Sequence, residues 1–334
     1  VERALLDMAD YLVGRDPRQI EDHWQVLFRS SYSRQMPILL SALSGLEMAC
    51  LDILGKSLGA PIWRLLGGTV RDRIRVYSGI GGPEPGQYAD NARVAVERGF
   101  TAVKMTPFPD PVRYIDTPAV ADRIVARVEA TREAVGPDID IAIDFHRAVS
   151  PAMAKILLKE LEPIRPLFVE EPTHPENVDA LLEITRSTHI PIATGERNTT
   201  RWGFREICEK KAAAILQPDI RHCGGILEMK KIAALAEVHY LAMAPHSAAD
   251  AVGVVAALHA MAGTPNFLIQ EFGGGTGEGL FTEPLTLEDG FVAIPQGPGL
   301  GFEIDPDGLE ALRLRDWRLR SMRRHPEDNS INDI

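Results

Sequence analysis

Between residues 74 and 271 the chain repeats one pattern, and this pattern limits the possible folds more than any other feature. Short apolar runs alternate with amphipathic stretches of helical length. Continuous apolar runs, without strict alternation of polar residues, are typical of parallel strands that helices cover on both faces. The runs are IRVYS (74–78), AVKM (102–105), IDIAID (139–144), PLFVE (166–170), PIAT (191–194), AAILQPD (213–219), YLAMAP (240–245) and NFLIQE (266–271).

The number and spacing of these runs predict a closed barrel. Eight strand–helix units in about 200 residues are the signature of a (β/α) barrel. We therefore expect an α/β fold, with a TIM-like (β/α)7β barrel over residues 72–275. Ser150-Pro151 and Thr117-Pro118 predict helix starts, because a hydroxyl N-cap followed by proline is common there. The alternative is a doubly wound sheet, but the glycine fingerprint expected after its first strand is absent from the sequence.

The segments that flank the barrel have a different pattern. Residues 1–71 are mostly helical in pattern, and one stretch, Pro37–Gly55, ends on a glycine suited to a helix C-cap. A short helical piece follows at Pro61–Gly68. Residues 276–334 are first rich in Gly and Pro and then polar. We expect the two segments to pack together as one capping domain.

Polar residues end six of the apolar runs. In a (β/α) barrel the active-site residues lie at the C-terminal ends of the strands. Because these residues recur at steps of 23 to 27 positions, about one strand–helix unit, all six side chains should point into one mouth. They are Asp144, Glu170, Glu196, Asp219, His246 and Glu271.

Asp144, Glu170 and Glu196 end three consecutive strands. A single acidic residue at such a place is more often a helix cap or a partner in a surface ion pair. Three in step would repel one another unless a cation offsets their charge. A set of carboxylate oxygens suits Mg²⁺, so we predict that these three residues bind it. Glu171 should face away from the mouth, since successive strand residues alternate in direction, and it could orient a neighbour.

Two histidines are candidate catalytic residues. His246 and Asp219 end neighbouring strands, and a carboxylate bonded to an imidazole fixes its tautomer and raises its basicity. His146 lies two residues beyond Asp144, on the same face or on the loop above it. We assign structural roles to the other histidines, which are His23, His174, His189, His222, His239, His259 and His325.

Two basic residues are candidate substrate contacts. Lys104 ends the second run, where it could act as a base or clamp, or extend past the metal site. Arg147 follows His146. The loop 106–117, with three prolines, is predicted to form a wall of the mouth.

Charge and cysteine content narrow the possible partners. The net charge of −11 and the pI near 5.4 disfavour nucleic acid and anionic membranes as partners. No uninterrupted apolar run reaches 18 residues, and no signal peptide opens the chain. Three widely spaced cysteines argue against a disulfide framework and against a zinc cage. We expect reduced thiols, a cytoplasmic location and a homo-oligomer.

The motifs of this chain resemble those of the enolase superfamily, in its mandelate racemase-like branch, and most of all the sugar-acid dehydratases of the galactonate dehydratase type. The resemblance covers essentially the whole chain. It implies an α+β capping domain, with strands and a mobile loop ahead of residue 1 of this sequence. The matching blocks are SALSGLEMACLDILGKSLGAPIWRLLGG (41–68), DFH (144–146), FVEEP (168–172), ATGER (193–197), LQPDIRHCGG (216–225), APH (244–246) and HPEDNS (325–330).

The resemblance also implies roles for the mouth residues. The three acids would bind Mg²⁺, His246 would be the general base, oriented by Asp219, and His146 would be the general acid. Glu271 would hold the substrate carboxylate by a hydrogen bond. The chain departs from the family where Thr106 replaces a second lysine, in DFHRA (144–148) and in HSAAD (246–250).

The implied reaction is dehydration of a sugar acid, a galactonate-like aldonate, to a 2-keto-3-deoxy sugar acid through an enolate. One alternative is racemisation or epimerisation at carbon 2, which needs a base on each face; the missing second lysine disfavours it. The other is a non-catalytic sugar-acid binding protein, which would lack an acid or a base.

Overall fold

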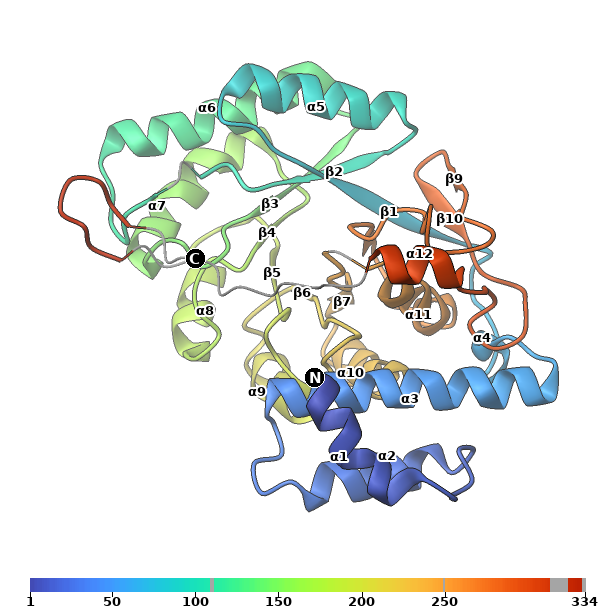
Figure 1. The fold of residues 1–334 in the computed structure, drawn as a ribbon. Coiled ribbons are helices and arrows are strands. Elements are labelled where there is room, and N and C mark those ends of the chain that lie inside the picture. The colour runs from blue at the N-terminus through green and yellow to red at the C-terminus, as the bar shows by residue number, and fades with distance from the viewer. Residues whose placement is uncertain (109–110, 249, 313–323, 332–334) are drawn as a thin grey trace.

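The computed structural model describes residues 1–108, 111–248, 250–312 and 324–331 (Figure 1). Its helices are α1 (Glu2–Leu12), α2 (Ile20–Ser30), α3 (Pro37–Leu58), α4 (Ile62–Leu65), α5 (Pro85–Glu97), α6 (Pro118–Val135), α7 (Pro151–Leu161), the short 3-10 helix η1 (Glu162–Ile164), α8 (Val178–Thr185), α9 (Thr200–Lys210), α10 (Ile226–Val238), α11 (Ala251–Ala262) and α12 (Pro306–Ala311). Its strands are β1 (Arg73–Ile80), β2 (Ala102–Met105), β3 (Asp140–Asp144), β4 (Phe168–Glu170), β5 (Ile192–Thr194), β6 (Ile215–Leu216), β7 (Ala242–Met243), β8 (Gln270–Glu271), β9 (Leu287–Glu288) and β10 (Phe291–Ala293).

Strands β1 to β8 form a closed parallel barrel, as the sequence predicts. Strands β1 to β7 pair in chain order. Strand β8 pairs in parallel with β1, and a bridge between Met243 and Phe267 joins β7 to the segment that leads into β8. Every apolar run of the sequence therefore contributes to the barrel, and the α/β barrel prediction is confirmed.

The barrel interior below the mouth is filled by side chains from all eight strands or the residues next to them. This follows from the alternation of side chains along a strand, which sends every second residue inward. A second and larger apolar core lies outside the strands, between them and the surrounding helices. The inner cluster consists of Tyr77, Ala102, Ala142, Phe168, Ala193, Ile215, Ala244 and Ile269.

The predicted helix boundaries are correct at two starts and wrong at one end. Ser150 caps α7 by accepting the N–H of Met153 at 3.1 Å, and α6 begins directly after Thr117. Helix α3 does not end at Gly55. It continues to Leu58, and Gly59, with φ of 61°, is the left-handed C-cap.

Gly55 has a packing role instead of a capping role. A Cβ atom at this position would lie 2.6 Å from the Cα of Gly299. The helix therefore needs a glycine there so that the C-terminal segment can approach its backbone closely.

The N-terminal and C-terminal segments meet beside the barrel. Asp52 accepts the N–H of Leu300 at 2.8 Å, and Trp63 donates its indole N–H to the carbonyl of Pro295 at 2.9 Å. The C-terminal segment also forms the hairpin β9–β10, which pairs antiparallel with the start of β1, a contact that the sequence pattern did not predict. The domain boundaries at residues 71 and 275 stay a prediction.

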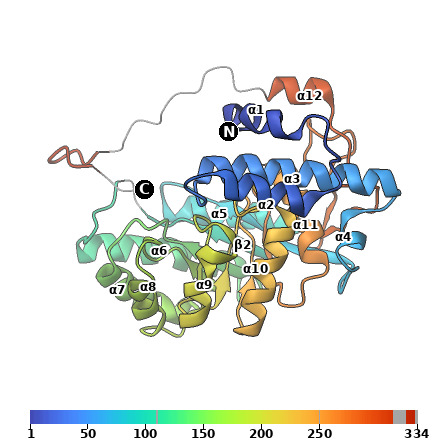
Figure 2. The ribbon, with the colours of Figure 1, turned by 90° about the horizontal axis from the view of Figure 1, so that it is seen from below.

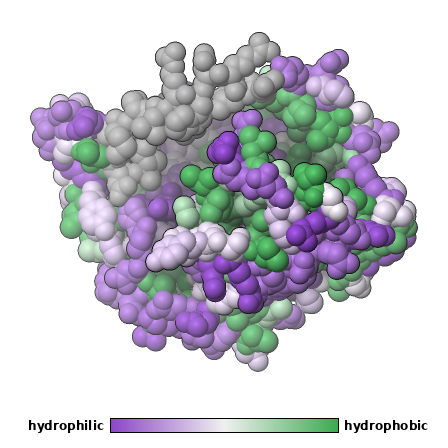
Figure 3. All heavy atoms as spheres, turned by 60° about the horizontal axis from the view of Figure 1, so that its bottom comes forward, coloured by the Kyte–Doolittle hydropathy of each residue, from purple (hydrophilic) through white to green (hydrophobic). Residues whose placement is uncertain are grey.

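The helices α1, α2 and α3 lie together on one side of the barrel, with α10 next to α3 (Figure 2). Helix α3 is long and apolar enough to cross a membrane by length and composition alone. It is partly buried and contacts α1, α2, α4 and α10. Figure 3 shows apolar side chains scattered between polar ones on this side of the molecule.

Candidate active site

The three predicted metal ligands lie together at the barrel mouth. Asp144 and Glu170 end β3 and β4 and face each other in the strand ladder, while Glu196 lies two residues beyond β5. One carboxylate oxygen from each residue lies within 4.8 Å of the others. Asp144 and Glu170 are 1% and 0% exposed. This set of oxygen donors from three separate strands can hold a divalent cation.

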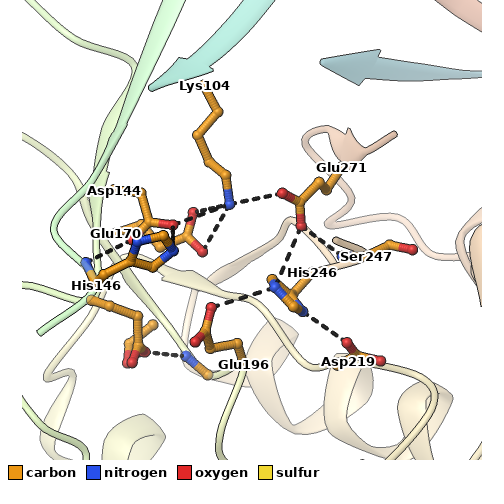
Figure 4. Close-up of polar contacts among 12 residues, drawn as sticks. Lys104, Asp144, His146, Glu170, Glu196, Asp219, His246, Ser247 and Glu271 are labelled. Carbon is orange, nitrogen blue, oxygen red and sulfur yellow. Dashed lines mark hydrogen bonds and ion pairs between the residues drawn. The ribbon is translucent and has the colours of Figure 1, made fainter. Parts of the chain in front are cut away.

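The electrostatics of the triad show why it needs positive charge. Burial, and then the charge of Asp144, raise the pKa of Glu170 to about 8. The side chain of Lys104 on β2 reaches into this cluster, with Nζ 3.0 Å from Glu170 and 3.4 Å from Asp144 (Figure 4). Burial acts to lower the pKa of Lys104, but the surrounding carboxylates hold it well above its ordinary value. Lys104 thus supplies one of the charges that the buried acids require.

His146 lies on the loop after β3, at the edge of the mouth. Its Nε2 is 2.9 Å from Asp144 Oδ2, its Nδ1 is 3.4 Å from Thr106 Oγ1, and 42% of its side chain is exposed. His146 and Arg147 both have positive φ, 45° and 62°, which turns the chain back over the strand end. His146 can therefore reach a bound molecule from the solvent side.

His246 and Asp219 form the imidazole–carboxylate pair that the strand register suggests. Asp219 Oδ2 is 2.8 Å from His246 Nδ1, and a backbone bridge also joins the two residues. The Nε2 of His246 points into the mouth, 3.4 Å from Glu196 and 3.7 Å from Glu271. Burial acts to lower the pKa of His246, but the bond to Asp219 and the charges of Glu271 and Glu196 raise it to about 9.

Glu271 closes the mouth on the side of β8. Its Oε1 is 2.9 Å from Lys104 Nζ, and its Oε2 accepts the N–H of Ser247 at 2.7 Å. Burial acts to raise the pKa of Glu271, but Lys104 and His246 hold it below its usual value. Glu271 is thus an acceptor in this arrangement. It could donate to a substrate carboxylate only if the approach of that like charge raised its pKa.

Arg147 contacts two acidic side chains, and these contacts were not predicted. Its Nη1 lies 2.9 Å from Glu171 and 2.6 Å from Glu196. Glu171 also accepts the N–H of Gly195 at 3.0 Å. Glu171 therefore holds the loop that carries Glu196. That Glu171 faces away from the mouth stays a prediction. A substrate contact of Arg147 stays a prediction.

The loop after β6 contributes two further residues that the sequence analysis did not place at the site. Arg221 Nε lies 2.9 Å from Asp219 Oδ1 and so fixes the outer side of that carboxylate. His222, which we had assigned a structural role, donates its Nε2–H to the backbone carbonyl of Glu196. Their position within three residues of Asp219 is the sequence signal that could have found them.

The barrel and its mouth define a class of protein, and comparison with known families identifies it. Residues 87–308 match the family described as enolase C-terminal domain-like, and residues 1–67 match the mandelate racemase/muconate lactonizing enzyme N-terminal domain. The chain belongs to the mandelate racemase/muconate lactonizing enzyme family of the enolase superfamily.

Two individual relatives indicate a more specific class of enzyme within this family. The chain is 41% identical to a D-galactonate dehydratase of Ralstonia nicotianae and 40% identical to one of Ralstonia pickettii, in both cases over 95% of this chain and 86% of the relative. Both relatives are dehydratases, and dehydratases are hydro-lyases.

Solved structures agree. A mandelate racemase/muconate lactonizing enzyme-like protein from Rubrobacter xylanophilus superposes with a TM-score of 0.88 at 36% identity, over 94% of this chain and 87% of that one. An enolase superfamily member from Salmonella Typhimurium gives a TM-score of 0.86 at 28% identity, over 92% of this chain and 85% of that one.

Proposed function

We propose that this chain is a Mg²⁺-dependent dehydratase that converts a galactonate-like aldonate into a 2-keto-3-deoxy sugar acid and water. The observation that carries the proposal is the presence, in one mouth, of a carboxylate triad between two histidines that differ in their surroundings. The relatives named D-galactonate dehydratase support the substrate class.

The two histidines would divide the proton transfers. His246, held by Asp219, would take the proton from carbon 2 of the substrate. His146, more exposed, would give a proton to the 3-hydroxyl, which leaves as water. The enol that remains gains a proton at carbon 3 to become the 2-keto-3-deoxy acid, so that one water is lost and nothing is oxidised.

Asp144, Glu170 and Glu196 would hold Mg²⁺, which supplies electrophilic stabilisation of the negative charge that develops on the substrate carboxylate. With its charge offset in this way, Glu196 would raise the pKa of His246 less, which favours the neutral imidazole that a base requires. Glu271 and Lys104 would contact the substrate from the β8 and β2 side.

The test is a panel of aldonates incubated with the purified chain and Mg²⁺, scored for 2-keto acid and by NMR for the product. We expect 2-keto-3-deoxy acid from a galactonate-like aldonate, and none after chelation of the metal. Conversion of the substrate into its carbon-2 epimer without loss of water would contradict the proposal. So would the absence of a 2-keto acid from every member of the panel.

A further inference from the structure

Helix α3 reaches the loop between β6 and α10 through two buried polar side chains. Glu47 accepts the backbone N–H groups of Ile226 at 2.9 Å and Leu227 at 2.8 Å. Ser44 Oγ accepts the N–H of Gly224 at 3.0 Å. The side chains of Ser44 and Glu47 belong to residues that are 0% and 2% exposed. A helix outside the barrel therefore holds the end of a loop that begins at the mouth.

This loop, residues 219–227, carries Asp219 at its first position. We call it the dyad loop, after the pair that Asp219 forms with His246. It is a tight turn, because the carbonyl of Asp219 accepts the N–H of Cys223 at 2.8 Å. His222 in the same turn donates its Nε2–H to the backbone carbonyl of Glu196. A displacement at the α10 end of the turn would thus shift both Asp219 and the backbone of Glu196, a proposed metal ligand.

Two glycines let the N-terminal helices come this close. Gly224 and Gly225 have φ of 120° and 91°. A Cβ atom on Gly225 would lie 2.3 Å from Glu47 Oε2, and one on Gly224 would lie 2.8 Å from the side chain of Glu228. The indole N–H of Trp24 also bonds to the carbonyl of Gly224 at 2.8 Å. The backbone of the dyad loop is therefore shaped to receive these side chains.

Packing alone does not explain why the carboxylate of Glu47 is buried at this position. Among the described residues, no Lys or Arg side chain lies within ion-pair distance of Glu47. Burial raises the pKa of Glu47 to about 7, against the opposing effect of the two N–H groups. An apolar side chain would avoid this cost but would leave the first N–H groups of α10 without acceptors. The carboxylate therefore serves the geometry of the loop.

We propose that Glu47 is a positioning residue that fixes the dyad loop and thereby the direction of Asp219 toward His246. The inference rests on the proposed function, in which Asp219 orients the base. Helix α3 would then influence the reaction although Glu47 does not contact the substrate.

The first test measures the loop itself and needs no turnover. Glu47→Gln keeps the size of the side chain, but its amide NH2 cannot accept the second N–H. In the full chain, hydrogen–deuterium exchange over residues 219–227 should become at least about fivefold faster, since a buried N–H loses its partner. Asp52→Asn is the matched control: it alters another α3 carboxylate, which accepts Leu300 N–H, and it should leave exchange in the dyad loop unchanged.

The second test measures catalysis with an aldonate that the wild type turns over. Glu47→Gln should lower kcat by about tenfold, because a displaced catalytic group loses rate even when substrate binds normally. The KM should change by less than about twofold. Asp52→Asn should keep the wild-type kcat. If Glu47→Gln does not fold, Ser44→Ala removes a single bond to the same loop and should show the same two effects, more weakly.

The outcomes are distinct. Unchanged exchange over residues 219–227 in Glu47→Gln overturns the inference, whether or not the enzyme is active. Faster exchange with a kcat equal to that of Asp52→Asn overturns it as well, because the loop then moves without consequence. A wild type that dehydrates no aldonate refutes the proposed function instead, and exchange alone then decides whether Glu47 fixes the loop.

Discussion

Two regions of this molecule bury polar side chains but surround them differently. One is the barrel mouth with its acidic triad. The other, which we call the seam, is the place where α11 meets α4 and residues 299–300 of the C-terminal segment. In the mouth, charged groups lie next to one another. One carboxylate oxygen from each of Asp144, Glu170 and Glu196 lies within 4.8 Å of the others. In the seam, polar side chains bond to neutral backbone groups.

Each region contains a histidine, and the pKa values of the two move in opposite directions. His259 is fully buried, whereas 14% of the His246 side chain is exposed. In the mouth, Asp219 and neighbouring carboxylates raise the pKa of His246 to about 9, although burial acts to lower it. In the seam, His259 Nδ1 accepts the N–H of Trp63 at 3.2 Å and its Nε2 donates to the carbonyl of Leu300 at 3.0 Å. Burial lowers the pKa of His259 to about 4.

The difference teaches how to separate a functional buried group from a structural one. Depth alone does not distinguish them, because Asp144 and Glu170 in the mouth are as deeply buried as His259 in the seam. A group that is crowded by like or ionised groups stores electrostatic free energy that a ligand can release. A group that is satisfied by backbone partners gains nothing from a ligand and serves the fold.

Removal of one member of the triad should have the largest effect. Glu170→Gln takes a charge from the centre of the cluster, so we expect loss of Mg²⁺ binding by calorimetry and a fall in kcat/KM of about 10³–10⁵, as the loss of several kcal/mol implies. Glu228→Gln, which changes a buried carboxylate paired with Arg201 outside the mouth, is the control and should keep its metal affinity. Wild-type Mg²⁺ affinity in Glu170→Gln would show that the crowded acids are not a metal site.

Replacement of the two mouth histidines should have the next largest effect and should separate their roles. His246→Asn should abolish both turnover and exchange of the carbon-2 proton with deuterated water. His146→Asn should block loss of water yet still allow exchange at carbon 2. Losing an acid or base typically lowers the rate by about 10²–10⁴.

Two results would contradict this division. If His146→Asn stops carbon-2 exchange as completely as His246→Asn does, the roles are wrongly assigned. If His146→Asn still dehydrates at nearly the full rate, another group expels the hydroxyl. NMR of the substrate and product in deuterated water measures both quantities in one sample.

The mouth was largely predictable from the sequence, because the barrel repeats. The runs that contain Asp144 and Glu170 end where β3 and β4 end, so the positions of these residues along the chain fix their positions across the ladder. The same reasoning brought Asp219 next to His246. The regular spacing of the short apolar runs is enough to predict the positions of these residues, and no long-range contact has to be known.

The contacts of Glu171 and Arg147 were not predictable in the same way. Strand alternation stops where the strand stops, and Glu171 and Arg147 have φ of 46° and 62°. These left-handed residues redirect the chain, so the neighbours of their side chains depend on two loops at once. The pairing of β10 with β1 also joins segments more than 200 residues apart, and no local pattern encodes it.

The seam allows the smallest of these predictions, and it concerns stability alone. Because the pKa of His259 in the fold lies near 4, below the ordinary 6.5, the fold favours the neutral ring, whose Nδ1 must accept the N–H of Trp63. The contribution to stability is therefore complete above about pH 6.5 and declines as the pH falls toward 4. Over that window the free energy of unfolding should lose about 3 kcal/mol from this residue.

His259→Gln isolates that contribution, because its amide can accept one N–H and donate another but cannot be protonated. At neutral pH the wild type should be more stable by about 1–3 kcal/mol, since the amide fits the two partners less well. This difference in the free energy of unfolding should shrink as the pH falls from about 7 to about 4. Urea unfolding of the two metal-free proteins at each pH measures it. His189→Gln, a change at an exposed imidazole, should leave stability nearly unaltered throughout. A constant difference between the wild type and His259→Gln across this range would mean that the seam does not hold a neutral histidine, and the contrast with the mouth would fail there.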